Sequence, residues 1–380
     1  MALKNITGQV AEGSNFFGRT KELKRALELL DDGNSLILAA PRRVGKTSFA
    51  RKIKDTVIEK GWNGFYIDLQ KPTTEFDFMK QFLKEIKGEN WFEKHVLGAV
   101  DEVTVKDVAL KFNAQKQDFY RKIEEALPYD EDTLIIFDEL TVFLDDVLRK
   151  KDDSQNEFKD VLHFLNWLRG LRIASGSKIR WIFCSSISIE SFAHKHSLSK
   201  TINDITPFKI GELKDDEPLL LVKALADSKK MSFSDELIHY MLEKLNWNLP
   251  YFIQILFREI VNLLEDEQPL LPKTIDEAYQ NLLAIDINFN TWTERLSYYD
   301  DEKRFARIIL NKLSKSKKAV KKDNLFDLVY IELNDHEKAD EIFLPLLKQL
   351  ETDGYIVSDK DKYTFRSSLL KDYWYNNFGK

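Results

Sequence analysis

The residues best suited to phosphate chemistry lie in the run SLILAAPRRVGKTSF, residues 35–49. The apolar residues 35–40 predict a buried strand, Pro41 ends it, and the amphipathic residues 45–58 predict a helix. A strand, a tight loop and a helix in this order suit an anion. The backbone N–H groups of the loop and the positive end of the helix dipole converge on one point. The stretch therefore predicts a phosphate-binding loop.

The residue types within this loop indicate their tasks. Gly45 lets the backbone approach a phosphate closely, Lys46 can reach the β- and γ-phosphate oxygens, and the hydroxyl of Thr47 can bind Mg²⁺. Ala40 stands where the first glycine of the pattern is usual. Because it precedes a proline, it should be extended with negative φ, so its side chain need not be strained. The predicted ligands are nucleotide phosphates with Mg²⁺, and the loop residues expected to contact them are Pro41, Arg42, Arg43, Val44, Gly45, Lys46, Thr47 and Ser48.

A second strand pattern ends in two acidic residues. Residues 133–138, TLIIFD, are apolar up to Asp138, and Glu139 follows directly. The carboxyl end of such a strand lies beside the phosphate loop in a parallel sheet. There Asp138 can hold the Mg²⁺ shell and Glu139 can polarise the attacking water. Downstream of a phosphate loop, this pattern strongly indicates a Walker B strand.

Three further candidates lie at the ends of predicted elements. The predicted strand at 178–185 ends at Ser185, which would lie beside the γ-phosphate or simply cap the strand. The predicted helix at 157–172 carries Arg169 and Arg172 near its C-terminus. Basic residues there can satisfy the helix dipole, or one of them can act as an arginine finger on a neighbouring nucleotide. Both interpretations stay open.

A glycine turn precedes the first predicted helix. Phe17, Gly18 and Arg19 lie about twenty residues ahead of the phosphate loop, before an amphipathic pattern that runs to Leu30. As bare sequence this turn is only a helix entry. Since many nucleotide switches place such a segment against the adenine, we expect these three residues near the nucleotide.

Composition narrows the class of protein. A chain of 380 residues should hold two or three domains. With 57 basic and 63 acidic residues, no chain-wide positive charge favours nucleic acid. The single cysteine, Cys184, excludes an intramolecular disulfide and suits a reducing compartment. No apolar run approaches the ~18 residues of a membrane span, so we expect a cytoplasmic protein with no membrane partner.

Beyond residue 213 the pattern changes to helices. The predicted segments are 217–229, 234–245, 250–264 and 274–285, with Ser234 as an N-cap and Pro250 at a first helical position. Three more helices at 303–313, 323–333 and 339–351, with strands at 355–357 and 363–365, predict a winged helix-turn-helix. The expected domains are therefore a nucleotide-binding core at 1–213, a helical lid at 214–290 and a winged helix at 291–380.

The winged helix is poorly equipped to read bases. Its third helix carries one lysine, Lys348, beside Glu341 and Glu351. A compact basic stretch at 312–322 could instead track DNA phosphates or form a solvated loop. Its lysines are Lys312, Lys315, Lys317, Lys318, Lys321 and Lys322. The apolar tail at 373–378 is expected to dock on its own or the neighbouring domain.

Together these motifs resemble the AAA+-like STAND ATPases, particularly the archaeal-type ATPase group, which also occurs in bacteria. The residues that carry the likeness are FFGR at 16–19, APRRVGKTS at 40–48, IIFDEL at 135–140, WLRGLR at 167–172, SSISIE at 185–190, TINDITPFKIGEL at 201–213 and NLPYFIQ at 248–254. The resemblance implies an α/β core with a parallel sheet, a helical lid and a C-terminal winged helix, with ATP or ADP held between the first two. It places Pro250 near the adenine, with Asn248 in place of a glycine. Initiator-type relatives carry a sensor arginine near this helix start, and Pro250 there implies slow turnover.

The resemblance implies a switch that binds and hydrolyses ATP and signals to a protein partner or to a nucleotide-dependent homo-oligomer. STAND relatives often act as sensors, including in defence against phage, and a separately encoded effector is expected here. Two alternatives stay open. One is a DNA-handling ATPase akin to initiators or transposition-associated loaders, which would use residues 312–322 and the wing. The other is a scaffold that binds nucleotide without turning it over.

Overall fold

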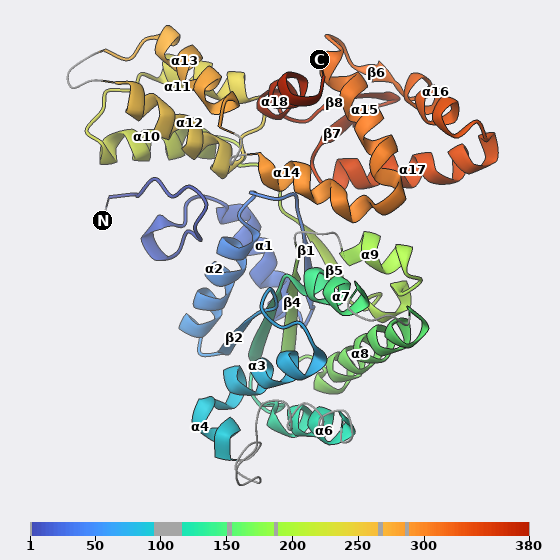
Figure 1. Ribbon diagram of the computed structural model, residues 1–380. Coiled ribbons are helices and arrows are strands. Elements are labelled where there is room, and N and C mark those ends of the chain that lie inside the picture. Colours follow the sequence, from blue (N-terminus) through green and yellow to red (C-terminus); the bar gives the residue numbers. More distant parts are fainter. Residues whose placement is uncertain are drawn as a thin grey trace. The chain divides into compact units, whose positions relative to one another are not determined.

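The computed structural model describes residues 2–94, 116–149, 154–185, 189–264, 269–285 and 289–379. These residues group into two compact units (Figure 1). We call the first the sheet unit, which consists of Thr20–Ala39 and Lys46–Ile210. The second, the C-terminal unit, consists of Met1–Arg19, Ala40–Gly45 and Gly211–Lys380. The phosphate loop therefore crosses from one unit to the other between Gly45 and Lys46, and the division into three consecutive domains stays a prediction.

Five parallel strands form the sheet, in the order β2-β3-β4-β1-β5. They are β1 Leu36–Ala39, β2 Asn63–Asp68, β3 Thr133–Asp138, β4 Ile179–Cys184 and β5 Thr206–Lys209. Strands β1, β3 and β4 lie within the predicted strands at 35–40, 133–138 and 178–185. Asp138 lies in register with Asp68 on one side and with Cys184 on the other. Because the strands are parallel, the residues that follow β3 and β4 lie at the same end of the sheet.

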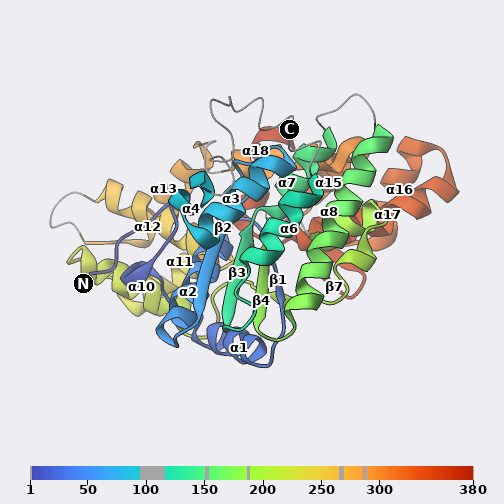
Figure 2. The same ribbon diagram turned by 90° about the horizontal axis from the view of Figure 1, so that it is seen from below.

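Helices cover both faces of this sheet (Figure 2). On one face, an apolar cluster of strand residues such as Ile135, Phe137 and Trp181 packs against the helices that follow β2, β3 and β4. These helices are α3 Glu75–Lys87, α4 Glu89–Phe92, α6 Lys116–Ala126, α7 Leu140–Arg149, α8 Ser154–Ser175 and α9 Ile189–Lys195. The other face carries α1 Thr20–Asp31 and α2 Lys46–Glu59. Every residue of β3 is buried, as its uninterrupted apolar run predicts.

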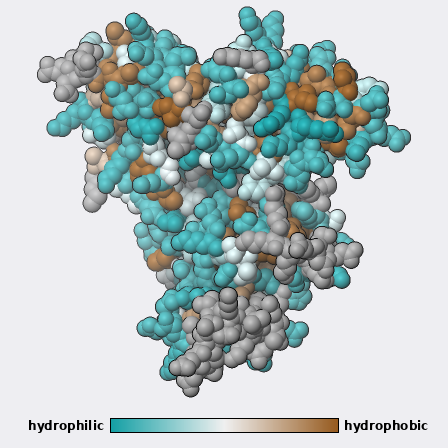
Figure 3. Space-filling model, in the orientation of Figure 1, coloured by the Kyte–Doolittle hydropathy of each residue, from teal (hydrophilic) through white to brown (hydrophobic). Residues whose placement is uncertain are grey.

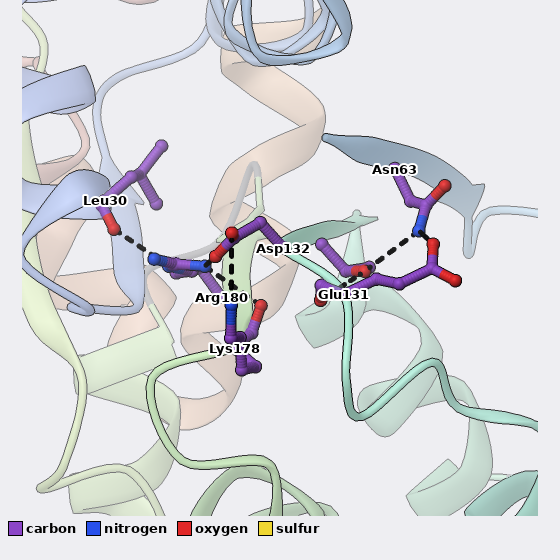
Figure 4. A network of polar contacts seen from close by, with 7 residues as sticks. Leu30, Asn63, Glu131, Asp132, Lys178 and Arg180 are labelled. Carbon is purple, nitrogen blue, oxygen red and sulfur yellow. Dashed lines mark hydrogen bonds and ion pairs between the residues drawn. The ribbon is translucent and has the colours of Figure 1, made fainter. Parts of the chain in front are cut away.

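A polar network closes the amino end of the sheet (Figure 4). Buried Arg180 pairs with Asp132 through Nη1 at 2.5 Å and donates from Nε to the carbonyl of Leu30 at 2.9 Å. Lys178 pairs with the same carboxylate at 3.3 Å. The hydrogen bond from Arg180 is the main reason why the pKa of Asp132 lies below its ordinary value. The network thus links the end of α1 and strand β4 to Asp132, the residue before β3.

In the C-terminal unit, the four predicted helices are present. They are α10 Glu217–Ser228, α11 Asp235–Leu245, α12 Pro250–Leu263 and α13 Pro272–Leu283. The predicted cap is confirmed, since the Ser234 side chain accepts from the N–H of Leu237. The predicted start of α12 at Pro250 is confirmed as well.

The remaining elements of this unit contain the three helices and the hairpin that were predicted for a winged helix-turn-helix. They are α14 Asn290–Arg295, α15 Lys303–Lys315, β6 Val320–Lys321, α16 Lys322–Leu333, α17 His336–Thr352, β7 Ile356–Asp359, β8 Lys362–Phe365 and α18 Ser368–Phe378. Strand β8 pairs antiparallel with both β6 and β7. The tail docks as predicted, because α18 packs on α15 and buries Tyr373 and Trp374. Short 3₁₀ turns span Gly13–Asn15 and Leu296–Glu302 in this unit, and Ser199–Thr201 in the sheet unit.

The surface is mostly polar, with scattered apolar patches (Figure 3). Ile331 on α16 and Leu344 on α17 are among the exposed large apolar side chains. None of the helices in the described ranges has the length and apolarity that crossing a membrane requires.

Candidate nucleotide site

Two side chains predicted to hold Mg²⁺ meet at the carboxyl end of the sheet. Thr47 is the second residue of α2 and Asp138 is the last residue of β3. The Thr47 hydroxyl donates to Asp138 Oδ2 at 2.7 Å. The start of the P-loop helix and the end of the Walker B strand are therefore joined through the two oxygen groups that a hard cation prefers.

These oxygen groups fit a Mg²⁺ ion that is bound together with phosphates. In the described ranges, no three His, Cys, Asp or Glu side chains gather into an all-protein metal cage. Mg²⁺ sites commonly combine one or two carboxylates with water and nucleotide phosphates instead. Thr47 and Asp138 would hold the ion in that way, and the ion would neutralise charge on the transferred phosphoryl group.

The Asp138 carboxylate is buried, with 4% of the residue exposed, and it accepts three hydrogen bonds. Besides the bond from Thr47, Oδ2 accepts from the Tyr66 hydroxyl at 2.6 Å, and Oδ1 accepts from the Glu139 N–H at 3.1 Å. Burial raises the pKa of Asp138, and the charge of Glu139 adds to this, whereas the bonds from Tyr66 and Thr47 oppose it. A cation at this carboxylate would relieve the cost of burying its charge.

Glu139, the predicted catalytic residue, has an unusual backbone conformation. Its φ of 59° lies in the left-handed region, which costs a residue other than glycine roughly 1–3 kcal/mol. Its Oε2 accepts from the Ser185 hydroxyl at 3.4 Å, at the end of β4. The structure thus brings together the two residues predicted to polarise water and to lie beside the γ-phosphate.

Arg19 forms hydrogen bonds that hold the phosphate loop in place. This buried side chain donates through Nη2 to the carbonyl oxygens of Val44 and Gly211, each at 2.8 Å. The backbone N–H of Arg19 donates to Glu217 Oε1 at 2.6 Å. A Cβ added to Gly18, where φ is +68°, would lie 3.1 Å from the Glu217 carboxyl carbon. Arg19 therefore positions the loop, and Gly18 leaves room for the Glu217 carboxylate that binds the Arg19 backbone.

The loop is also tied to the start of α12. Arg43 has a φ of 66°, and its guanidinium carbon lies 4.4 Å from the centre of the Tyr251 ring, within cation–π range. Tyr251 directly follows Pro250, the residue expected near the adenine. The predicted residues thus divide between the units. Phe17, Gly18, Arg19, Pro41, Arg42, Arg43, Val44, Gly45 and Pro250 lie in the C-terminal unit, while Lys46, Thr47, Ser48, Asp138, Glu139, Arg169, Arg172 and Ser185 lie in the sheet unit.

The turn between α17 and β7 packs on the phosphate loop, a contact that sequence reasoning missed. A Cβ added to Gly354, where φ is +85°, would lie 2.7 Å from Pro41 Cβ and 2.9 Å from Trp247 Cη2. The preceding Asp353 forms a buried ion pair with Arg295. Only glycine fits this contact, and a buried ion pair fixes the turn that carries it.

The two arginines considered as fingers differ in their surroundings. Arg172 has a side chain that is only 4% exposed and donates to both carboxylate oxygens of Asp204, at 2.8 and 2.9 Å. Burial alone would raise the pKa of Asp204, but this ion pair lowers it overall. Because this bidentate pair engages the Arg172 guanidinium, Arg172 is the less suited of the two to a finger role, which stays a prediction. Arg169 is 36% exposed and lies 3.6 Å from Asp204 Oδ1.

Sequence reasoning also missed Tyr66 and Arg51. Tyr66 lies on β2, and the Arg51 guanidinium carbon lies 4.5 Å from the centre of its ring. Burial, followed by the charge of Asp138, raises the pKa of Tyr66, so its hydroxyl stays protonated. The sequence contains one signal for Tyr66, its position two residues before Asp68. Asp68 pairs with Asp138, so once the register is known, Tyr66 lies on the same face of the sheet as Asp138.

Comparison with known proteins supports the same fold. No protein-family model matches the sequence, and no curated protein matches it. The structure is similar to the Walker-type ATPase PABY2304 of Pyrococcus abyssi, with a TM-score of 0.61 and 15% identity, over 97% of this chain and 99% of that chain. It is also similar to the ORC2 protein of Aeropyrum pernix in its ADPNP–ADP complexes, with a TM-score of 0.54 and 12% identity, over 97% of each chain. The chain therefore has the α/β P-loop fold of the AAA+ ATPases, as predicted.

Proposed function

We propose that this protein binds and hydrolyses ATP and that its C-terminal unit reads the state of the phosphate loop. The observation that carries the catalytic part is the bond between Thr47 and Asp138, beside the strained Glu139. Lys46, the first residue of α2, would contact the β- and γ-phosphates. Glu139 would orient and polarise the water that attacks the γ-phosphate, and Ser185 would help to hold its carboxylate.

The test of hydrolysis is the Glu139→Gln variant. Since glutamine cannot act as a base, we expect turnover to fall about 10²–10⁴-fold, while ATP stays bound after gel filtration. Lys46→Ala is the control that should lose nucleotide binding itself. Wild-type turnover is expected below ~1 per second, at the low end of enzyme rates. Equal turnover in wild type and Glu139→Gln would exclude this role and favour a non-hydrolysing scaffold.

The switch part of the proposal is supported by the contact of Gly354 with Pro41 and Trp247. A loop that rearranges around a different number of phosphates would push on this turn, and the turn is fixed to its domain through Asp353 and Arg295. A conformational change needs such a difference in contacts between two states. The C-terminal unit can thus pass the nucleotide state to a partner.

Gly354→Ala tests this coupling, because the new methyl group would overlap Pro41. We expect a changed rate of ADP release by at least ~5-fold, a coupling of about 1 kcal/mol. Gly61→Ala is a matched control, because Gly61 has a similar φ of +90° and an added Cβ would meet nothing within 4 Å. If both variants release ADP at the wild-type rate, the turn does not read the loop.

We assign the output to a STAND-like signalling pathway, including phage defence, on the strength of the motif resemblance. A nucleotide-dependent homo-oligomer or a separate effector would receive the signal. Mass photometry of Glu139→Gln with ADP and with Mg-ATP tests the oligomer. If it forms only with ATP, Arg169→Ala should weaken it. Arg169 is the exposed member of the arginine pair, whereas Arg172→Ala should mainly destabilise the fold.

A DNA-handling function is the second candidate, and one observation favours it. Exposed lysines run from the last turn of α15 to β6, namely Lys312, Lys315, Lys317, Lys318 and Lys321. Against this, the exposed face of α17 carries Glu337, Asp340 and Glu341. Binding through several phosphates would weaken steeply as salt rises. An absence of duplex binding at low salt would remove this candidate.

A further inference from the structure

Tyr66 reaches the Walker B carboxylate from a neighbouring strand. Asp68 is the register partner of Asp138, and Tyr66 lies two residues earlier on the same face of the sheet. An aromatic side chain can span such a diagonal offset. The Tyr66 hydroxyl donates to Asp138 Oδ2 at 2.6 Å, the same oxygen that accepts from Thr47. A residue outside the known motif positions thus contacts the centre of the candidate site.

Arg51 holds the ring of Tyr66 in place. It lies four residues after Thr47 on α2, so both side chains occupy one face of that helix. Its guanidinium carbon lies 4.5 Å from the centre of the Tyr66 ring. The ring is therefore fixed by Arg51 on its face and by Asp138 at its hydroxyl.

We infer that Tyr66, held by Arg51, is a positioning residue for metal–nucleotide binding, because it fixes the orientation in which Asp138 acts on a nucleotide-bound Mg²⁺ ion. This inference rests on the proposed function, since it assumes that Mg²⁺ binds beside Thr47 and Asp138. Two hydroxyl groups on Oδ2 and the Glu139 N–H on Oδ1 define the plane of the carboxylate. Without the Tyr66 hydroxyl, Asp138 loses a charge-assisted bond and can rotate.

Nucleotide binding with and without metal tests this role in Tyr66→Phe, which keeps the ring and removes only the hydroxyl. A fluorescent ADP analogue is titrated in excess Mg²⁺ and again in EDTA. In Mg²⁺ we expect affinity to fall about 10- to 100-fold, the effect of losing a hydrogen bond to a charged group. In EDTA we expect a change of less than about twofold, because phosphate contacts to the loop and Lys46 are untouched.

Tyr120→Phe is the matched control. Tyr120 lies in the sheet unit and donates to Glu75 at 3.3 Å, so the variant also removes a phenol–carboxylate bond, but not one to Asp138. It should leave both affinities unchanged. Arg51→Lys keeps the charge and removes the planar group over the ring, so it should give a smaller loss than Tyr66→Phe, again in Mg²⁺ only.

The outcomes separate this inference from the proposed function. An equal loss with Mg²⁺ and with EDTA would make Tyr66 a general support of the site and overturn the inference. An unchanged Tyr66→Phe variant would overturn it as well. If the wild type fails to bind the analogue in either condition, the proposed function has failed first, and the inference falls with it.

Discussion

The two ends of β3 carry carboxylate networks with opposite chemistry, around the partly exposed Asp132 and the buried Asp138. At the amino end, Asp132 pairs with Arg180 and Lys178, and its pKa is lowered. At the carboxyl end, Asp138 is more deeply buried and accepts from two hydroxyl groups and one backbone N–H, and its pKa is raised. The first network neutralises its charge within the fold, whereas the second keeps a negative charge that a bound cation would balance.

We interpret the first network as one that stabilises the fold and the second as part of the proposed ligand site. Charged side chains that pair with each other, such as Arg180 and Asp132, leave no unpaired charge to attract a ligand. Backbone strain and buried charge cost free energy and persist mainly at functional sites, and here the strained Glu139 directly follows the buried Asp138. Substitutions at the carboxyl end should therefore affect activity, and those at the amino end should affect stability.

Among substitutions at the two ends of β3, the largest expected effect is that of Asp138→Asn. ATP hydrolysis should fall about 10²–10³-fold, because the charge that holds the Mg²⁺ shell is lost. The free energy of unfolding should stay the same or rise by about 1 kcal/mol, since a buried carboxylate with a raised pKa costs stability at neutral pH. Steady-state ATPase assays and urea unfolding measure the two quantities. A strong loss of stability would place Asp138 with the structural network.

Arg180→Met should give the reverse result. It removes the bonds to Leu30 and Asp132, and we expect a loss of about 2–4 kcal/mol in unfolding free energy. Activity per folded molecule should stay within about twofold of wild type. Lys178→Met is the control with a smaller effect, because Lys178 is half exposed. An Arg180→Met variant that is as stable as wild type but fails to hydrolyse ATP would contradict the assignment of this network to stability.

The smallest effect is a dependence on pH with opposite signs at the two ends. The lowered pKa of Asp132 gives stability that is present above the ordinary value of 3.8 and is lost as pH falls through its folded pKa. The raised pKa of Asp138 has the opposite effect, since its cost to stability declines as pH falls from neutral through that pKa towards 3.8. The unfolding free energies of wild type, Asp132→Asn and Asp138→Asn are measured between pH 7 and 3. The difference between wild type and Asp132→Asn and the difference between wild type and Asp138→Asn should change in opposite directions as pH falls. Parallel changes would refute this account of the pKa values.

Much of the fold could be predicted because its signals are local. The apolar runs of β1, β3 and β4, the cap at Ser234 and the proline that starts α12 each determine their own element. Strand β6 was missed because a two-residue strand has no periodicity and depends on pairing with β8. The end of β5 also depends on pairing, since only Thr206–Lys209 align with β1.

The candidate site was predictable where the motif itself brings residues together, as with Thr47 and Asp138 at one sheet edge. Tyr66 could not be found in this way, because its role depends on the register between β2 and β3. Gly354 required a contact between residues more than 300 positions apart. The pairing of Arg172 could not be predicted either, because helix position alone cannot show that Asp204 engages its guanidinium group.

Hydrogen exchange of Glu139→Gln in the presence of no nucleotide, ADP or Mg-ATP tests the central claim most directly. The account predicts that either nucleotide protects residues 40–49, and that residues 350–357 exchange at different rates with ADP and with ATP. Protection of residues 40–49 with identical exchange at 350–357 in all three states would contradict the claim that the C-terminal unit reads the loop. Unprotected residues 40–49 would contradict the nucleotide site itself.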